Sequence, residues 1–163
     1  MQTIMITGCS SGFGLETARY FLEQGWKVIA TMRAPQEGVL PASDRLRLVR
    51  LDVTSAQSIA EAIAEAGEID VLVNNAGVGM LNALEGAPRE AIANLFATNT
   101  LGTIAMTQAV IPRFRARRSG TIVNITSAVT LQPMPLLAVY TASKAAVNAF
   151  TESLALELRA FNI

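Results

Sequence analysis

The sequence has no histidine and only one cysteine, Cys9. Without histidine, neither a Ser-His-Asp triad nor a histidine-ligated zinc site is possible, so no metal site is expected and any acid–base chemistry must use Tyr, Lys, Asp, Glu or Cys. A single cysteine excludes an internal disulfide and predicts a reducing compartment such as the cytoplasm. Because no base lies near it in the sequence, Cys9 is interpreted as a small packing residue and not as a nucleophile.

Charged residues are also scarce, at 16% of the chain, and the 13 basic residues equal the 13 acidic ones. With no net charge, the chain has no overall field to attract nucleic acid or an acidic membrane. The arginine-rich stretch 113–118 precedes Gly120 at the end of an expected helix, where cations complement the helix dipole. We interpret this stretch as a solvated helix end and not as a nucleic-acid site.

No segment has the character of a membrane span or of a signal peptide. Residues 91–112 carry no formal charge, but they include seven Asn, Thr and Gln side chains, which is too polar for a spanning helix and predicts a buried or subunit-facing one. The N-terminus has no basic region before its apolar residues and is interpreted as a strand that starts at once.

Hydrophobic residues, in contrast, make up 51% of the 163 residues, which suits a single domain over 1–163. Short β-branched runs alternate with helical patterns: strands are expected at 4–7, 27–31, 46–52, 70–74 and 121–126, and helices at 13–24, 55–66, 88–117 and 138–160. The helix 88–117 is expected to break near 94–99, and 34–44 is expected to be a loop. This alternation predicts an α/β fold, a Rossmann-type doubly wound parallel sheet flanked by helices on both faces.

A glycine-rich turn joins the first expected strand to the first helix. Gly8, Gly12 and Gly14 would bring bare backbone and a helix N-terminus up to a phosphate, although their spacing is not GxGxxG and a purely structural turn remains an alternative. In dinucleotide sites the end of the second strand faces the adenosine ribose. There the chain has Arg33 and no carboxylate, which favours NADP(H), with NAD(H) possible. An arginine without a ligand is the alternative for Arg33.

Tyr140 and Lys144 are four residues apart in an expected helix and therefore share one face. A lysine ammonium close to a phenol favours the phenolate form, so Tyr140 is a candidate general acid and base. Taken singly, this pair also fits a helix surface, Ser127 fits a strand end, and Asn99 fits a helix break.

Taken in order, these motifs resemble those of the short-chain dehydrogenase/reductase family. The similar elements are Thr7–Gly14 (TGxxxGxG), Leu51–Val53, Asn74–Gly77 (NNAG), Asn99 within the long helix, Ser127, and Tyr140–Lys144 (YxxxK). The resemblance covers residues 1–163, and the chain stops where family members continue with C-terminal strands and most of a substrate lid. It implies either a fragment or a natural truncation.

The resemblance implies an NADP-dependent oxidoreductase that transfers hydride between NADP(H) and a carbonyl or alcohol. Tyr140 would exchange the proton, Ser127 would orient the substrate oxygen, Lys144 would hold the nicotinamide ribose, and Asn99 would hold a water that links Lys144 to solvent. The cofactor-binding residues that it implies are Gly8, Ser10, Ser11, Gly12, Phe13, Gly14, Arg33, Asp52, Val53, Asn75, Ala76 and Gly77, together with Tyr140 and Lys144.

Two further expectations concern partners. The apolar residues among 129–139 predict an apolar ketone or alcohol as substrate, and the uncharged stretches of helices 88–117 and 138–160 predict a homodimer or tetramer. Two other functions remain open. A nicotinamide-dependent epimerase or dehydratase of the extended branch would have a different glycine spacing and a longer chain. A nucleotide-binding or partner-binding fragment without turnover is favoured by the absent C-terminal section, which would leave a sheet edge unpaired.

Overall fold

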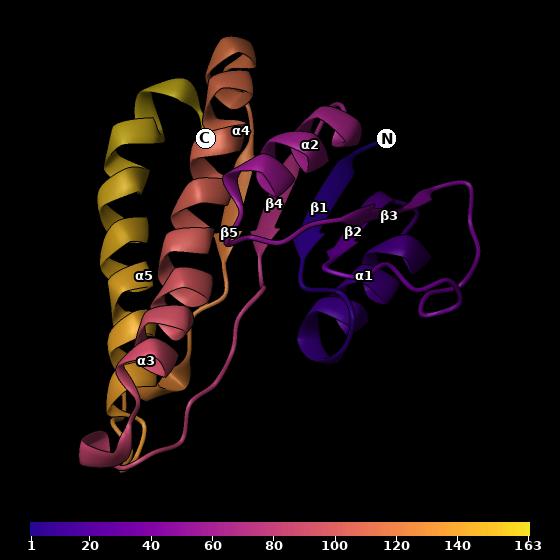
Figure 1. The fold of residues 1–163 in the computed structure, drawn as a ribbon. Helices are drawn as coiled ribbons and strands as arrows, with labels where there is room; N and C mark the ends of the chain where they lie inside the picture. Colours follow the sequence, from indigo (N-terminus) through magenta and orange to yellow (C-terminus); the bar gives the residue numbers. More distant parts are fainter.

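The computed structural model describes residues 1–163 and contains one sheet of five parallel strands. The strands are β1 (Thr3–Thr7), β2 (Lys27–Met32), β3 (Leu46–Arg50), β4 (Val71–Asn74) and β5 (Thr121–Asn124). Their order across the sheet is β3-β2-β1-β4-β5, so the chain winds outward from β1 in both directions (Figure 1). This is the doubly wound Rossmann-type sheet that the sequence predicted.

Five α-helices connect and cover the strands. They are α1 (Gly12–Glu23), α2 (Ala56–Ala66), α3 (Arg89–Phe96), α4 (Gly102–Arg117) and α5 (Ala138–Leu158), with short 3-10 turns at η1 (Leu84–Gly86), η3 (Ala128–Thr130) and η4 (Arg159–Phe161). Residues 34–44 contain no helix or strand, as predicted. None of the helices combines the length and the apolar character that a membrane crossing requires.

The break expected in the long helix near 94–99 takes the form of a change in helix type, since α3 ends at Phe96 and α4 begins at Gly102. Between α3 and α4 the chain forms a π-helical segment, η2 (Ala97–Leu101), so the helical rod continues from 89 to 117 with one widened turn (Figure 1). The hydroxyl of Thr98 donates to the carbonyl of Asn94 (3.1 Å), and that of Thr103 donates to the carbonyl of Asn99 (2.9 Å). These side-chain bonds satisfy main-chain acceptors where the helical ladder changes, and such π-bulges often occur at functional sites.

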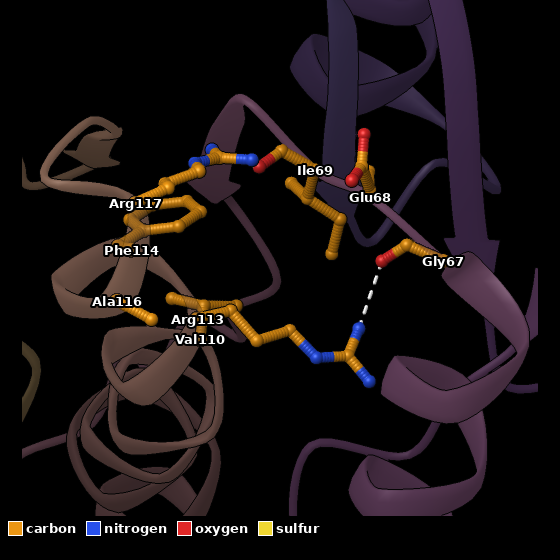
Figure 2. A pocket seen from close by; sticks show the side chains of 8 residues that line it. All are labelled: Gly67, Glu68, Ile69, Val110, Arg113, Phe114, Ala116 and Arg117. Carbon is orange, nitrogen blue, oxygen red and sulfur yellow. Dashed lines mark hydrogen bonds between the residues drawn. The ribbon is translucent and has the colours of Figure 1, made fainter.

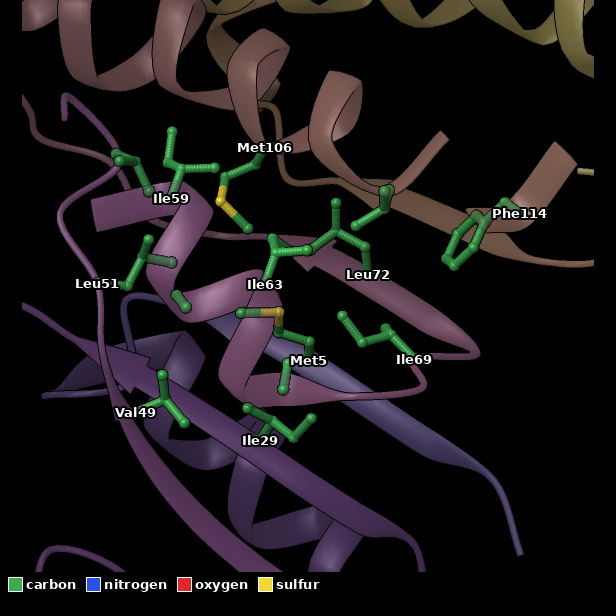
Figure 3. Packing of buried hydrophobic residues seen from close by; sticks show 14 residues of the cluster. Met5, Ile29, Val49, Leu51, Ile59, Ile63, Ile69, Leu72, Met106 and Phe114 are labelled. Atoms are coloured by element: carbon green, nitrogen blue, oxygen red, sulfur yellow. The ribbon is translucent and has the colours of Figure 1, made fainter. Parts of the chain in front are cut away.

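Successive side chains of each strand point to opposite faces of the sheet, and this divides the core into two clusters. Ile4 and Ile6 of β1 pack with α1 on one face, whereas Met5 packs with α2 and α4 on the other. Figure 3 shows Met5 and Leu72 in one cluster with Ile59 and Ile63 of α2. Both faces of the central strands are therefore buried, as expected of a parallel sheet.

Candidate active site at the carboxyl edge of the sheet

The glycine turn after β1 places an uncapped helix N-terminus at the edge of the sheet. Gly8 and Gly12 have φ values of +75° and +60°, in the left-handed region that favours glycine. Ser11 is the N-cap of α1, yet its side chain makes no capping hydrogen bond, and the first turn contains no acidic residue. Because Ser10, Ser11 and Phe13 line a cleft, the free N–H groups of this turn are available to an anion there.

The turn is locked against the segment that follows β4. The Thr7 hydroxyl oxygen accepts the main-chain N–H groups of Asn75 (3.0 Å) and Ala76 (2.9 Å), and the Asn75 amide donates to the carbonyls of Thr7 (2.9 Å) and Gly8 (3.2 Å). A Cβ atom at Gly14 would overlap the Gly8 carbonyl and the Asn75 amide. The predicted turn and the predicted NNAG segment therefore form one unit, held by a threonine whose role the sequence analysis missed.

One cleft of about 990 Å³ brings most of the predicted residues together. Those that line it are Gly8, Ser10, Ser11, Phe13, Arg33, Asp52, Val53, Asn75, Ala76, Gly77, Ser127, Tyr140 and Lys144. Gly12, Gly14 and Asn99 do not line it. Gly14 and Asn99 are buried behind its wall. The sequence analysis did not single out other lining residues, among them Met32, Thr54, Val78, Asn94, Thr98 and Thr126.

At one end of the cleft, Asp52 is held by its neighbour Thr54. The Asp52 carboxylate accepts the Thr54 hydroxyl (2.7 Å) and the Thr54 main-chain N–H (2.9 Å). These hydrogen bonds, with smaller contributions from the positive charges of Arg33 and Arg50, hold the pKa of Asp52 below its ordinary value. Asp52 is therefore ionised at neutral pH, and the exposed Arg33 supplies a cation to the same cleft.

At the other end, Lys144 is buried at the start of α5. Its Nζ donates to the carbonyl of Ile125 (2.8 Å), and burial lowers its pKa because the charged form is poorly solvated there. Tyr140 lies one turn earlier in α5, and Ser127 caps η3, where its oxygen accepts the N–H of Val129 at 3.4 Å. Neither hydroxyl donates to a protein acceptor, so both are free to donate to a ligand in the cleft.

Asn99 fastens the wall behind these residues. It lies in the widened turn η2, and its amide exchanges two hydrogen bonds with the main chain of Val78 (2.8 and 2.9 Å) and donates to the Ser143 hydroxyl (3.1 Å). The Ser143 hydroxyl donates in turn to the carbonyl of Tyr140 (2.7 Å). Asn99 thus connects the chain after β4 to the first turn of α5, and no local sequence pattern indicated Ser143 as the link.

A second hollow, of about 550 Å³, lies at the opposite edge of the sheet between α4 and the segment before β4 (Figure 2). Arg113 donates there to the carbonyls of Ile63 (3.0 Å) and Gly67 (2.8 Å), and Arg117 donates to that of Ile69. These arginines are exposed but bonded, so the stretch 113–118 fastens α4 to its neighbours and is more than the solvated helix end expected from sequence. The hollow shares no lining residue with the cleft.

The lowered pKa of Asp52 makes a prediction about stability and pH. A carboxylate whose pKa is lower in the folded state than in the unfolded state stabilises the fold at pH values above its unfolded-state pKa. This contribution is lost as the pH falls through its folded-state pKa. We expect Asp52→Asn to unfold more easily than wild type in urea at neutral pH, with the difference shrinking below about pH 4. Glu37→Gln, which changes an exposed carboxylate on the 34–44 loop, is the control and should unfold like wild type at neutral pH. A pH-independent difference for Asp52→Asn would contradict the assignment.

Comparison with known proteins places this geometry in a family. The model of the short chain dehydrogenase family matches residues 2–163. Retinol dehydrogenase 8 of Bos taurus is 42% identical over 99% of this chain and 56% of its own length, and 3-ketodihydrosphingosine reductase of Bacteroides thetaiotaomicron is 42% identical over 99% and 60%. The chain thus spans little more than half the length of these curated relatives.

Solved structures agree with the fold. A 3-ketoacyl-(acyl-carrier-protein) reductase from Brucella melitensis, complexed with NADH, superposes with a TM-score of 0.93 at 30% identity over 99% of this chain and 71% of that one. The closed form of a serine dehydrogenase complexed with NADP+ superposes with a TM-score of 0.89 at 34% identity, over 96% and 66%. The chain belongs to the short-chain dehydrogenase family.

Proposed function

We propose that this chain is the NADP(H)-binding catalytic domain of an oxidoreductase that transfers hydride between NADP(H) and a carbonyl or alcohol. The observation that carries the proposal is the meeting of two sets of residues in one cleft. The uncapped turn at Ser10 and Ser11 offers main-chain N–H donors, and Ser127 and Tyr140 offer free hydroxyls to the cleft that Lys144 also lines. The first set suits a phosphate and the second suits the proton transfer of carbonyl reduction.

The residues of the cleft fit a dinucleotide. The turn from Gly8 to Phe13 would hold the pyrophosphate, since its N–H groups have no side-chain cap and no acid repels an anion. Asp52 and Val53 would contact the adenine, and Asn75 to Gly77 would lie along the cofactor. When bound, the nicotinamide supplies or accepts the hydride, whereas the protein supplies position and protons.

In the proposed reduction, Tyr140 donates its phenolic proton to the carbonyl oxygen of the substrate, and in oxidation it accepts a proton from the alcohol. Ser127 donates a hydrogen bond to the same oxygen and orients it. Lys144 would hold the ribose hydroxyls, and its bond to the Ile125 carbonyl positions its amine for this role. Asn99 holds the chain behind Lys144 and, through a bound water, would connect it to solvent.

The hydrogen bonds that Asn99 makes to two segments support its proposed role behind Lys144. Its amide fixes Val78 on the wall of the cleft and, through Ser143, fixes the first turn of α5 that contains Tyr140. A Cβ atom at Gly77 would lie 3.3 Å from the Asn99 oxygen and 3.5 Å from Lys144 Nζ, so Gly77 keeps the space between them open. A bound water requires such a polar space.

A second candidate function is binding of the nucleotide, or of a partner, without turnover. It is favoured by β5, which lies at the edge of the sheet. Val123 and Ile125 on and just after this edge strand are exposed. An edge strand of this kind offers unpaired main-chain groups to another strand.

We also propose that the chain forms a homodimer or tetramer through the helical regions 88–117 and 138–160. The exposed side chains of α5 include Ala142, Ala145, Ala149 and Leu156 at helical spacing, and this apolar stripe is interrupted by Glu152 and Ser153. Light scattering at micromolar concentration would measure the assembly, and a monomer would contradict it.

Replacement of the proposed acid tests catalysis. We expect Tyr140→Phe to lower kcat/KM for NADPH-dependent ketone reduction by about 10²-fold or more, because general acid catalysis is lost, while NADPH binding is kept. Tyr20→Phe removes the other tyrosine hydroxyl, which is exposed on α1 on the far face of the sheet, and should leave the rate unchanged. Equal rates for Tyr140→Phe and wild type would contradict the role of Tyr140, and binding without turnover in wild type would support the second candidate function.

Replacement of Arg33 tests the cofactor preference. We expect calorimetry to show tighter binding of NADPH than of NADH, and Arg33→Ala to weaken NADPH binding by about 10- to 100-fold, the range of a lost charge-assisted hydrogen bond, with NADH binding little changed. Arg89→Ala, an exposed arginine at the start of α3, is the matched control. An equal loss for both nucleotides would show that Arg33 does not distinguish them.

A further inference from the structure

Two loops beside the cleft expose an unusual concentration of large apolar side chains. Between 44% and 87% of each of these residues is exposed: Val78, Leu81 and Leu84 in the segment after β4, and Leu131, Met134 and Leu136 in the segment before α5. We refer to these six residues as the apolar lip. Exposed apolar patches of this kind mark sites that bind a ligand or a partner more often than they mark surface without a function.

The two halves of the apolar lip are joined to each other. The main-chain N–H of Asn82 donates to the carbonyl of Leu136 (2.9 Å). Leu136 has φ +64°, a left-handed conformation that is unfavourable for a leucine, and it follows Pro135. Surrounding structure must hold such a residue in place, and strained backbone of this kind concentrates at ligand-binding sites.

The apolar lip is continuous with the proposed active site. Val78 lines the same cleft as Tyr140, and the segment that contains Leu136 runs directly into α5, where Leu137 accepts the first helical hydrogen bond from Thr141 (2.7 Å). In Figure 1 the segments that contain the lip lie beyond the sheet, at the end of the molecule where α3 and α5 begin. A ligand whose oxygen reaches Ser127 and Tyr140 would extend from the cleft onto this surface.

The two segments that contain the apolar lip carry no charged side chain, and the nearest charges along the chain are Glu85, directly after Leu84, and Lys144 in α5. Residues 71–84 and 119–143 include no Asp, Glu, Lys or Arg. An anionic group held on these segments would lose hydration without gaining an ion pair from them, and the exposed carboxylate of Glu85 beside Leu84 would repel it. A neutral apolar group has no ionic hydration to lose, and burial of its surface on the lip is favourable.

We propose that the apolar lip binds the non-reacting part of a neutral, extended apolar ketone or alcohol, whose oxygen is held by Ser127 and Tyr140. This inference rests on the proposed function and names the substrate class of the same site. The substrate surface buried on the lip raises kcat/KM, because each methylene that leaves water contributes to binding in the transition state. A second copy of the chain or a lipid surface on the lip are the other occupants, and the experiment separates them.

The experiment measures NADPH-dependent reduction of straight-chain methyl ketones from 2-butanone to 2-decanone. We expect kcat/KM to rise about three- to fourfold per added methylene. Leu131→Gln and Leu84→Gln, one exposed leucine from each half of the lip, should flatten this rise with little effect on 2-butanone. Tyr20→Gln, an exposed apolar-to-polar change on α1, should keep the full slope. The carboxylate 9-oxodecanoate should be a much poorer substrate than 2-decanone.

Binding of the same ketones to the NADP+-loaded chain, followed by saturation-transfer NMR, separates the two proposals. Binding that depends on ketone length and on Leu131 without any turnover would support the lip and contradict hydride transfer. Turnover in which kcat/KM rises equally with ketone length in wild type and in both lip variants would contradict the role proposed for the apolar lip and support hydride transfer. A change of oligomeric state or of binding to neutral lipid vesicles in the lip variants, with an unchanged slope, would overturn it in favour of a second copy or a lipid surface. Absence of ketone binding in both assays would also overturn it.

Discussion

The close approach between the turn after β1 and the segment after β4 is the constraint on which the rest of the cleft depends. Glycine at positions 8 and 14 makes this approach possible, because a Cβ atom at Gly8 would overlap Ala76 and one at Gly14 would overlap the Gly8 carbonyl and the Asn75 amide. Thr7 and Asn75 close the contact with four hydrogen bonds. A Cβ atom at Gly14 would push the turn away from β4, and the first turn of α1 would no longer face the cleft.

A second constraint acts through buried polar groups behind the cleft. Lys144 is buried against the Ile125 carbonyl, and Asn99 is buried against Val78 and Ser143. Buried polar groups destabilise a fold unless they are hydrogen-bonded, so these bonds are required once the groups are placed there. The widened turn η2 fits this arrangement, since it displaces Asn99 from a regular helical position. The result is a rigid wall on which Tyr140 and Ser127 present free hydroxyls.

The sequence predicted the parts of the structure that depend on local pattern. The five strands follow from short β-branched runs between helical patterns. Most of the cleft residues were implied by the resemblance of the ordered motifs to the short-chain dehydrogenase/reductase family. The sequence did not predict contacts between distant segments. Thr7 meets Asn75 across 68 residues, and Arg113 meets Ile63 across 50, so no local periodicity contains them. The left-handed Leu136 and the π-helical turn also depend on neighbours that fold beside them, which tertiary packing decides.

The central claim is that the carboxyl edge of the sheet, and not the hollow at its opposite edge, receives the nucleotide. Backbone amide NMR during a titration with NADPH tests it most directly. The account predicts the largest shifts at residues 8–13 and 75–79, with smaller ones near Arg33 and Tyr140. Shifts concentrated at 67–70 and 110–117, or no saturable shift at any site, would contradict it.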